Sequence, residues 1–99
     1  MRRLEVTARA QRDVERHGQW WARHRDKAPE LFKQELAVAY SVIQTQPESG
    51  QRYAVVRGQQ VWRQLMPKTK RHVYYRLDGD DVVRVMAVWG ATRGRGPRL

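Results

Sequence analysis

The chain has 99 residues, a net charge of +10 and no cysteine, which excludes disulfides, thiolate catalysis and cysteine-ligated zinc. The length predicts a single domain over residues 1–99 with one small core. Hydrophobic residues make up 40% of the chain, a fraction typical of a globular protein. The lack of cysteine agrees with a reducing compartment, and the longest uncharged apolar-rich run, residues 36–46, is too short to cross a bilayer. We therefore expect a cytoplasmic protein without a membrane partner.

The positive charge is mostly arginine and is concentrated in the second half of the chain. Sixteen of the 20 cationic side chains are arginine, whose planar guanidinium group suits phosphate and carboxylate. Residues 1–50 have a net charge of +2 and residues 51–99 a net charge of +8, with no acidic residue between Ser49 and Leu77. Because these like-charged side chains repel one another, we expect an anionic macromolecular partner.

The first half of the chain predicts a short strand followed by two helices. Residues 2–7 alternate between apolar and polar side chains, and Thr7 is a suitable N-cap for a helix that begins at Ala8. Pro29 suits the first position of a second helix, which should end before Pro47. The expected apolar stripes are Ala10, Val14, His17 and Trp21 in the first helix and Phe32, Leu36, Ala39 and Ile43 in the second. The short linker predicts an antiparallel helical hairpin.

The second half predicts an antiparallel sheet. Residues 53–57 form a short extended segment, and residues 61–66, 72–77 and 82–89 alternate as strands do. In the last strand one apolar face is expected, made of Val83, Val85, Ala87 and Trp89. The sequence therefore predicts an α+β fold of order β-α-α-β-β-β, in which an antiparallel sheet of three or four strands packs against an N-terminal helical hairpin.

Basic and aromatic side chains are expected together on one face of this sheet. The alternation predicts a shared face for Arg63, His72, Tyr74, Arg76 and Arg84. Opposite positions on paired strands lie about 5 Å apart, so these side chains would form one cationic surface suited to phosphate groups. A merely solvated sheet face is the alternative. The excess of one charge sign favours a role in binding protein or nucleic acid.

A ribonuclease site on the same face is a second possibility. Metal-independent RNA cleavage needs a base, an acid and cations near the phosphate. His72 is the obvious acid–base candidate, with Arg63, Arg76 and Tyr74 beside it. A lone histidine at the start of a strand is more often a surface residue, so the pattern favours binding over catalysis. No cofactor and no metal are expected, because the two helical histidines, His17 and His24, lack a third ligand.

Trp20 and the C-terminal segment are further candidates for contact with a partner. Trp20 and Trp21 are about 100° apart on a helix, so one of them must lie at the border of the core. An exposed tryptophan is a typical binding anchor. Arg93, Arg95 and Arg98 alternate with glycine and proline in the last residues. This segment is either an arm that binds phosphate or carboxylate, or a frayed tail.

An ordered set of motifs runs through nearly the whole chain. It consists of L-E-V-T, Trp20-Trp21, P-E-L-F-K-Q-E-L-A-V-A, Q-P-E-S-G, V-W-R-Q-L, R-H-V-Y-Y-R-L, D-G-D-D-V-V-R-V-M-A-V-W-G and R-G-R-G-P-R-L. At these spacings the set resembles the RelE/ParE superfamily of bacterial type II toxins. The resemblance implies a β-α-α-β-β-β fold. It also implies a toxin that is neutralised by a cognate antitoxin, whose usually acidic C-terminal segment covers apolar and basic surface.

The resemblance leaves two activities open. RelE-like members cleave mRNA in the ribosome with Lys, Arg and Tyr or His side chains, but no Tyr or His follows Trp89 here. The closing V-W-G-A-T-R-G-R-G-P is more similar to ParE-like members, which inhibit DNA gyrase. We therefore predict a ParE-like toxin; a ribosome-dependent mRNA interferase and a degenerate toxin that only binds antitoxin are the alternatives. The residues expected to bind target or antitoxin are Arg63, Arg76, Arg84, Arg93, Arg95 and Trp20.

Overall fold

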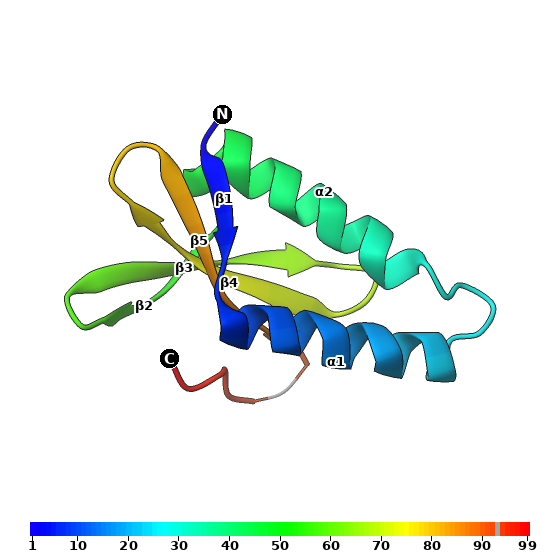
Figure 1. The fold of residues 1–99 in the computed structure, drawn as a ribbon. Helices are drawn as coiled ribbons and strands as arrows, with labels where there is room; N and C mark the ends of the chain where they lie inside the picture. The colour runs from blue at the N-terminus through cyan, green and yellow to red at the C-terminus, as the bar shows by residue number, and fades with distance from the viewer. Residues whose placement is uncertain (93) are drawn as a thin grey trace.

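The computed structural model of the protein describes residues 1–92 and 94–99. Within these residues two α-helices cover one face of a five-stranded sheet (Figure 1). The helices are α1 (Ala8–His24) and α2 (Leu31–Thr45), and a short 3-10 helix, η1 (Pro47–Ser49), follows them. The strands are β1 (Arg3–Val6), β2 (Gln51–Val56), β3 (Gln59–Met66), β4 (Arg71–Asp78) and β5 (Val82–Gly90).

The sheet is larger and more mixed than predicted. Its strand order is β1-β5-β4-β3-β2. Strands β2 to β5 pair antiparallel, whereas β1 pairs parallel with β5 at the other edge. The prediction of three or four antiparallel strands was therefore wrong in number and in the direction of β1. The alternation in residues 2–7 indicates a strand, but a strand's partner depends on where the helical hairpin returns the chain, which alternation does not encode.

Strand β2 owes its place in the sheet to a two-residue turn. Arg57 and Gly58 both have positive φ, 52° and 79°, as a type I′ hairpin turn requires. Its right-handed twist matches that of the flanking strands. The segment predicted only as a short extended piece, residues 53–57, thus contributes residues 53–56 to β2, a full strand that pairs with β3, while Arg57 belongs to the turn.

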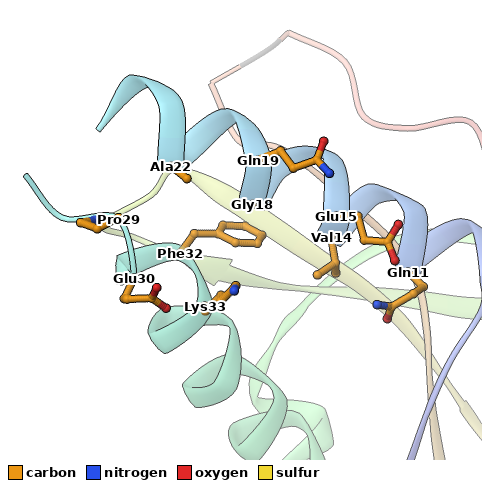
Figure 2. Close-up of a pocket in the computed structure, with 10 residues that line it drawn as sticks. All are labelled: Gln11, Val14, Glu15, Gly18, Gln19, Ala22, Pro29, Glu30, Phe32 and Lys33. Carbon is orange, nitrogen blue, oxygen red and sulfur yellow. The ribbon is translucent and has the colours of Figure 1, made fainter. Parts of the chain in front are cut away.

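The helices begin for different reasons. At the start of α1 the Thr7 hydroxyl accepts a hydrogen bond from the Ala10 amide at 3.1 Å, which confirms the predicted N-cap. Helix α2 begins at Leu31 rather than at Pro29, because the residues before it form a turn that is held by the Trp21 indole: Nε1 donates to the Ala28 carbonyl at 2.8 Å. The helices converge near this turn (Figure 1), where Gly18 of α1 lies over the Phe32 ring of α2 (Figure 2).

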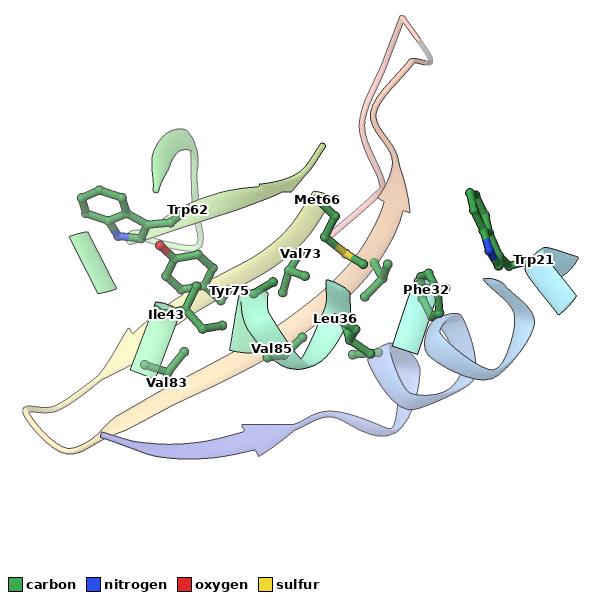
Figure 3. Packing of buried hydrophobic residues seen from close by; sticks show 13 residues of the cluster. Trp21, Phe32, Leu36, Ile43, Trp62, Met66, Val73, Tyr75, Val83 and Val85 are labelled. Carbon is green, nitrogen blue, oxygen red and sulfur yellow. The ribbon is translucent and has the colours of Figure 1, made fainter. Parts of the chain in front are cut away.

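The main core lies between the helices and the sheet, and it includes or contacts the predicted apolar stripes of both helices except His17 (Figure 3). Trp62 lies near one end of this core and Trp21 near the other (Figure 3). The Tyr75 hydroxyl, which enters the core from β4, donates to the Pro47 carbonyl. The buried residues of the main core are Ala10, Trp21, Phe32, Leu36, Ala39, Ile43, Trp62, Met66, Val73, Tyr75, Val83, Val85 and Val88.

A β-bulge in β5 divides the apolar residues of that strand between the two faces of the sheet. The register between β4 and β5 shifts at Met86, which is an extra residue in the ladder. Val83 and Val85 therefore face the helices, whereas Ala87 and Trp89 pack in a second, smaller cluster. The prediction of one apolar face for all four was wrong, because a bulge moves the alternation by one residue and leaves no mark in a period-two pattern.

Asp13 of α1 supplies the acceptor that the bulge requires. Asp13 is 3% exposed, and its carboxylate accepts a hydrogen bond from the Val88 amide, two residues beyond the bulge, at 3.0 Å. The same carboxylate is 2.9 Å from Arg9 Nε and 3.0 Å from Arg16 Nη2. Since a buried charge is tolerated only when it is paired, Asp13 ties α1 to β5 at one position.

Candidate functional site

The register brings the five predicted basic and aromatic residues to one face of the sheet. Arg63 lies opposite Tyr74, and Arg76 lies opposite Arg84. His72 is on the same strand as Tyr74 and Arg76, two residues along, so it shares their face. We call this surface, opposite to the helices, the ladder face; it consists of Arg63, His72, Tyr74, Arg76 and Arg84.

Two of these arginines are engaged by carboxylates. Arg84 Nε lies 2.5 Å from Asp78 Oδ2 and its Nη1 lies 2.8 Å from Glu5 Oε1, while Arg76 Nε lies 2.9 Å from Asp78 Oδ1. The hydrogen bond from Arg84 holds the pKa of Asp78 below its usual value, and the same bond raises the pKa of Arg84. The charge of this half of the ladder face is therefore largely neutralised within the fold.

The other half of the ladder face is packed. Tyr74 is 1% exposed, with the Tyr53 ring edge-on at 4.8 Å between centroids and the His72 ring at 5.8 Å. The Arg63 guanidinium lies 5.2 Å from the Tyr53 ring centroid, and its Nε donates to Gln51 Oε1 at 2.8 Å. Burial, and then the charge of Arg63, lower the pKa of His72. The four candidate catalytic groups thus meet on one face, but Tyr74 is covered and the charged form of His72 is disfavoured.

The described part of the C-terminal segment, residues 94–99, lies against this second cluster. Trp89 Nε1 donates to the Arg95 carbonyl at 3.2 Å, and Leu99 packs on the cluster. Near the start of α1, Arg9 Nη1 donates to the Arg98 carbonyl at 2.8 Å. The described residues therefore form a strap over the sheet and not a frayed tail. The Arg95 side chain is exposed on it, and the predicted binding residue Arg93 lies outside the described residues.

Gly96 determines how closely the strap approaches the sheet. A Cβ at this position would overlap the Tyr53 hydroxyl oxygen, whereas a Cβ at Gly94 meets nothing within 4 Å. We expect Gly96→Ala to lift the strap and to speed hydrogen exchange of the Trp89 indole at least tenfold, as measured by NMR. Gly94→Ala is the matched control and should leave the rate unchanged. Equal rates in both variants would contradict this arrangement.

Trp20 is the exposed member of the tryptophan pair, which confirms that one of the two lies at the border of the core. It is 40% exposed, against 7% for Trp21. The His24 imidazole stacks on it with centroids 4.4 Å apart. The guanidinium carbons of Arg25 and Arg71 lie 5.5 and 5.2 Å from its ring centroid. Trp20 is therefore surrounded by cationic and aromatic groups.

A hollow of about 380 Å³ opens beside Trp20, between α1 and the ends of β4 and β5. We call it the Trp20 hollow; its lining residues are Arg16, His17, Trp20, Lys70, Arg71, Gly90 and Thr92. Arg71 Nε donates to His17 Nδ1 at 3.1 Å, and Arg71 Nη1 donates to the Thr69 carbonyl. Lys70 and Arg71 were not among the predicted binding residues. The acid-free stretch of the sequence contains both, but only the folded sheet brings them to α1.

The half-buried His17 is expected to make the fold sensitive to acid. Burial, followed by the charges of Arg71 and Arg16, lowers the pKa of His17 from 6.5 to about 4. Between these values the unfolded chain binds the proton and the folded chain does not, so stability falls as the pH falls, by at most about 1.4 kcal/mol per pH unit. Urea unfolding at pH 7 and pH 5 measures this loss. His17→Asn, which keeps an acceptor for Arg71, should lose less stability than the parent; an equal loss would exclude His17 as the cause.

A second hollow, of about 400 Å³, lies between the two helices (Figure 2). Val14, Gly18 and Phe32 contribute apolar surface to it, and the charged side chains around it include Glu15 and Lys33. Its mixed charges distinguish it from the Trp20 hollow.

Two further properties bear on function. Within residues 1–92 and 94–99, no helix is long and apolar enough to span a membrane. In the same residues no three histidine or acidic side chains are grouped closely enough to hold a metal ion.

One comparison with known proteins identifies a family, and another shows a similar fold. A family model described as the ParE toxin of the type II toxin–antitoxin system parDE matches residues 4–94. Among solved structures, the chain is similar to one from the chromosomal ParDE toxin–antitoxin system of P. aeruginosa, with a TM-score of 0.72 and 17% sequence identity over 91% of this chain and 96% of that chain. At this identity the likeness shows the fold alone. No curated protein matches the chain.

Proposed function

Because the chain belongs to the ParE toxin family of type II toxin–antitoxin systems, we propose that it inhibits DNA gyrase by binding to it and that a cognate antitoxin neutralises it. The family match extends over residues 4–94, so it includes both helices and all five strands. An inhibitor of this kind needs a complementary surface and no reacting group of its own. The charge of +10 supports an acidic segment in the antitoxin.

The state of the ladder face is the observation that carries this proposal. General acid–base catalysis requires side chains that reach the substrate and carry the right proton. Tyr74 is covered by Tyr53, the protonated form of His72 is disfavoured, and Arg76 is paired with Asp78. These contacts favour a binding surface over a ribonuclease site. Ribosome-dependent mRNA cleavage through Arg63, His72, Tyr74 and Arg76 remains the alternative.

We propose that the target is contacted directly by those predicted binding residues that form no ion pair with an acidic side chain in the described part of the chain. These are Arg63 on β3, Arg95 on the strap, and Trp20 with its neighbouring cations. We propose that Arg76 and Arg84 shape the ladder face through Asp78 instead of contacting the target. Arg93 stays a binding residue predicted from the sequence.

Supercoiling of relaxed plasmid by purified gyrase, with the full chain added, tests the target. We expect inhibition that the cognate antitoxin reverses. The double variant Arg63→Gln, Arg95→Gln should need at least tenfold more protein for half inhibition. Arg12→Gln with Arg23→Gln, two exposed arginines of α1, is the control of equal charge and should inhibit as the parent does.

Two results would overturn the proposal. One is full supercoiling at saturating protein. The other is mRNA cleavage in a translating extract that His72→Ala with Arg76→Ala abolishes, because this would assign the ladder face to the ribonuclease alternative.

A further inference from the structure

We propose that the Trp20 hollow is a carboxylate-binding subsite that receives an acidic side chain of a peptide segment. The proposal depends on the proposed function in one respect only, which is that the partner carrying this segment is a neutralising antitoxin. The hollow itself is defined by geometry: α1 supplies His17 and Trp20, the turn before β4 supplies Lys70, and the first residue of β4 is Arg71. Its volume of about 380 Å³ leaves room for a side-chain carboxylate and its stem.

Three of the cations at or beside this hollow have no internal counter-charge in the described residues. In the described residues no acidic side chain forms an ion pair with Arg25, Lys70 or Arg71, whereas Arg16 is paired with Asp13. Arg25 and Arg71 both lie over the Trp21 ring, 5.7 and 5.4 Å from its centroid, as they do over Trp20. Two like charges are thus held on one aromatic pair. Burial and the charge of Arg25 lower the pKa of Arg71, so an incoming anion would relieve this repulsion.

Arg71 is already fixed in position to receive an anion. Its Nε and Nη1 are used by His17 and by the Thr69 carbonyl, and its Nη2 has no hydrogen-bond partner in the described residues. The turn that carries Thr69 is itself fixed to α2, because the Glu35 carboxylate accepts hydrogen bonds from the Lys68 and Thr69 amides, each at 2.8 Å. A guanidinium held in this way loses little freedom on binding, and a carboxylate would gain charge-assisted hydrogen bonds.

The surroundings favour a peptide over a nucleic acid. Single-stranded nucleic acids bind largely by stacking bases on free aromatic faces, but the Trp20 ring already stacks with His24 and has the Arg25 and Arg71 guanidinium groups beside it. Beyond Arg25 lies another hollow, of about 450 Å³, to which Trp21, Ala28 and Leu31 contribute. A peptide segment could place an acidic side chain in the Trp20 hollow and an apolar side chain in this second one, whereas a phosphate backbone would occupy the Trp20 hollow alone.

Titration of 15N-labelled protein with an acetylated and amidated peptide of repeated Glu-Leu-Ala-Glu tests the proposal. We expect the Trp20 indole resonance to shift on binding and the Trp62 resonance to stay in place. Lys70→Gln and Arg71→Gln should each raise the dissociation constant at least fivefold. Arg12→Gln, which removes the same charge from an exposed position on α1, should change it less than twofold. Lys70 lies in a turn, so we expect Lys70→Gln to leave the fold intact. This variant therefore tests the proposal even if Arg71→Gln unfolds.

Three results would overturn the proposal. The first is equal weakening by Lys70→Gln and Arg12→Gln, which would indicate general charge attraction. The second is unchanged binding of a peptide in which Gln replaces Glu. The third is tighter binding of an oligo-dT of equal charge that Lys70→Gln abolishes, which would make the hollow a nucleic-acid site. The peptide titration contains no gyrase, so its outcome does not depend on whether the protein inhibits gyrase.

Discussion

Replacing Asp13 with alanine is expected to lower the free energy of unfolding by about 3–5 kcal/mol, a typical cost of breaking a buried ion pair. The variant leaves the Val88 amide, next to the bulge, without its acceptor at 3.0 Å. It also leaves Arg9 and Arg16 without their shared carboxylate. Such a loss is a large fraction of the stability of a domain of this size. Urea unfolding followed by tryptophan fluorescence measures it.

Two further variants isolate the cause. Asp13→Asn keeps an oxygen for the Val88 amide while it removes the charge, so it should cost less than the alanine variant. Glu15→Ala removes the same charge from an exposed position on the same helix and should change stability by about 0.5 kcal/mol or less. Losses of similar size for Asp13→Ala and Glu15→Ala would show that the buried carboxylate has no special role.

Replacing Glu35 with alanine is expected to cost about 2–4 kcal/mol and to weaken peptide binding at the Trp20 hollow. The carboxylate accepts hydrogen bonds from the Lys68 and Thr69 amides and, at 2.7 Å, from the Thr69 hydroxyl. Thr69 is 1% exposed, so water cannot replace the lost acceptor, and unsatisfied buried groups cost about 1–3 kcal/mol each. Because Lys70 follows directly, a loosened turn would move it away from α1. Urea unfolding and the peptide titration give the two readouts.

Glu30→Ala is the control for this variant. Glu30 is exposed at the start of α2 and makes no side-chain capping bond, so its loss should cost less than about 1 kcal/mol and leave peptide binding unchanged. If Glu35→Ala destabilised the fold but left the peptide affinity intact, the turn would not be what positions Lys70 and Arg71.

The local elements were largely predictable because their signals are local. The apolar stripe of α2, including Phe32 and Ile43, is buried as its helical spacing predicts. The Thr7 cap and the strands around residues 61–66 and 72–77 follow from capping chemistry and alternation. The superfamily resemblance, drawn from the order of these segments, is confirmed by the family match over residues 4–94.

The candidate site was predictable only in part. Alternation alone was sufficient to place Arg63 and Tyr74 on one face. It did not show that Asp78 pairs with Arg76 and Arg84. Ion pairing of this kind depends on the direction of side chains across neighbouring strands. The sequence does not encode it locally, because a free arginine and a paired arginine are the same residue type.

The helices, most strands, the family and the excess of arginine in the second half of the chain were predictable from the sequence, because each of these depends on residues close together in the chain or on their order. Three features became visible only in the folded protein: β1 pairs in parallel with β5, the bulge at Met86 turns Trp89 to the other face, and Arg71 reaches Trp20. These features join residues that are distant in the chain. Their physical reason is packing, since the register is set by which contacts bury apolar surface and satisfy polar groups at once.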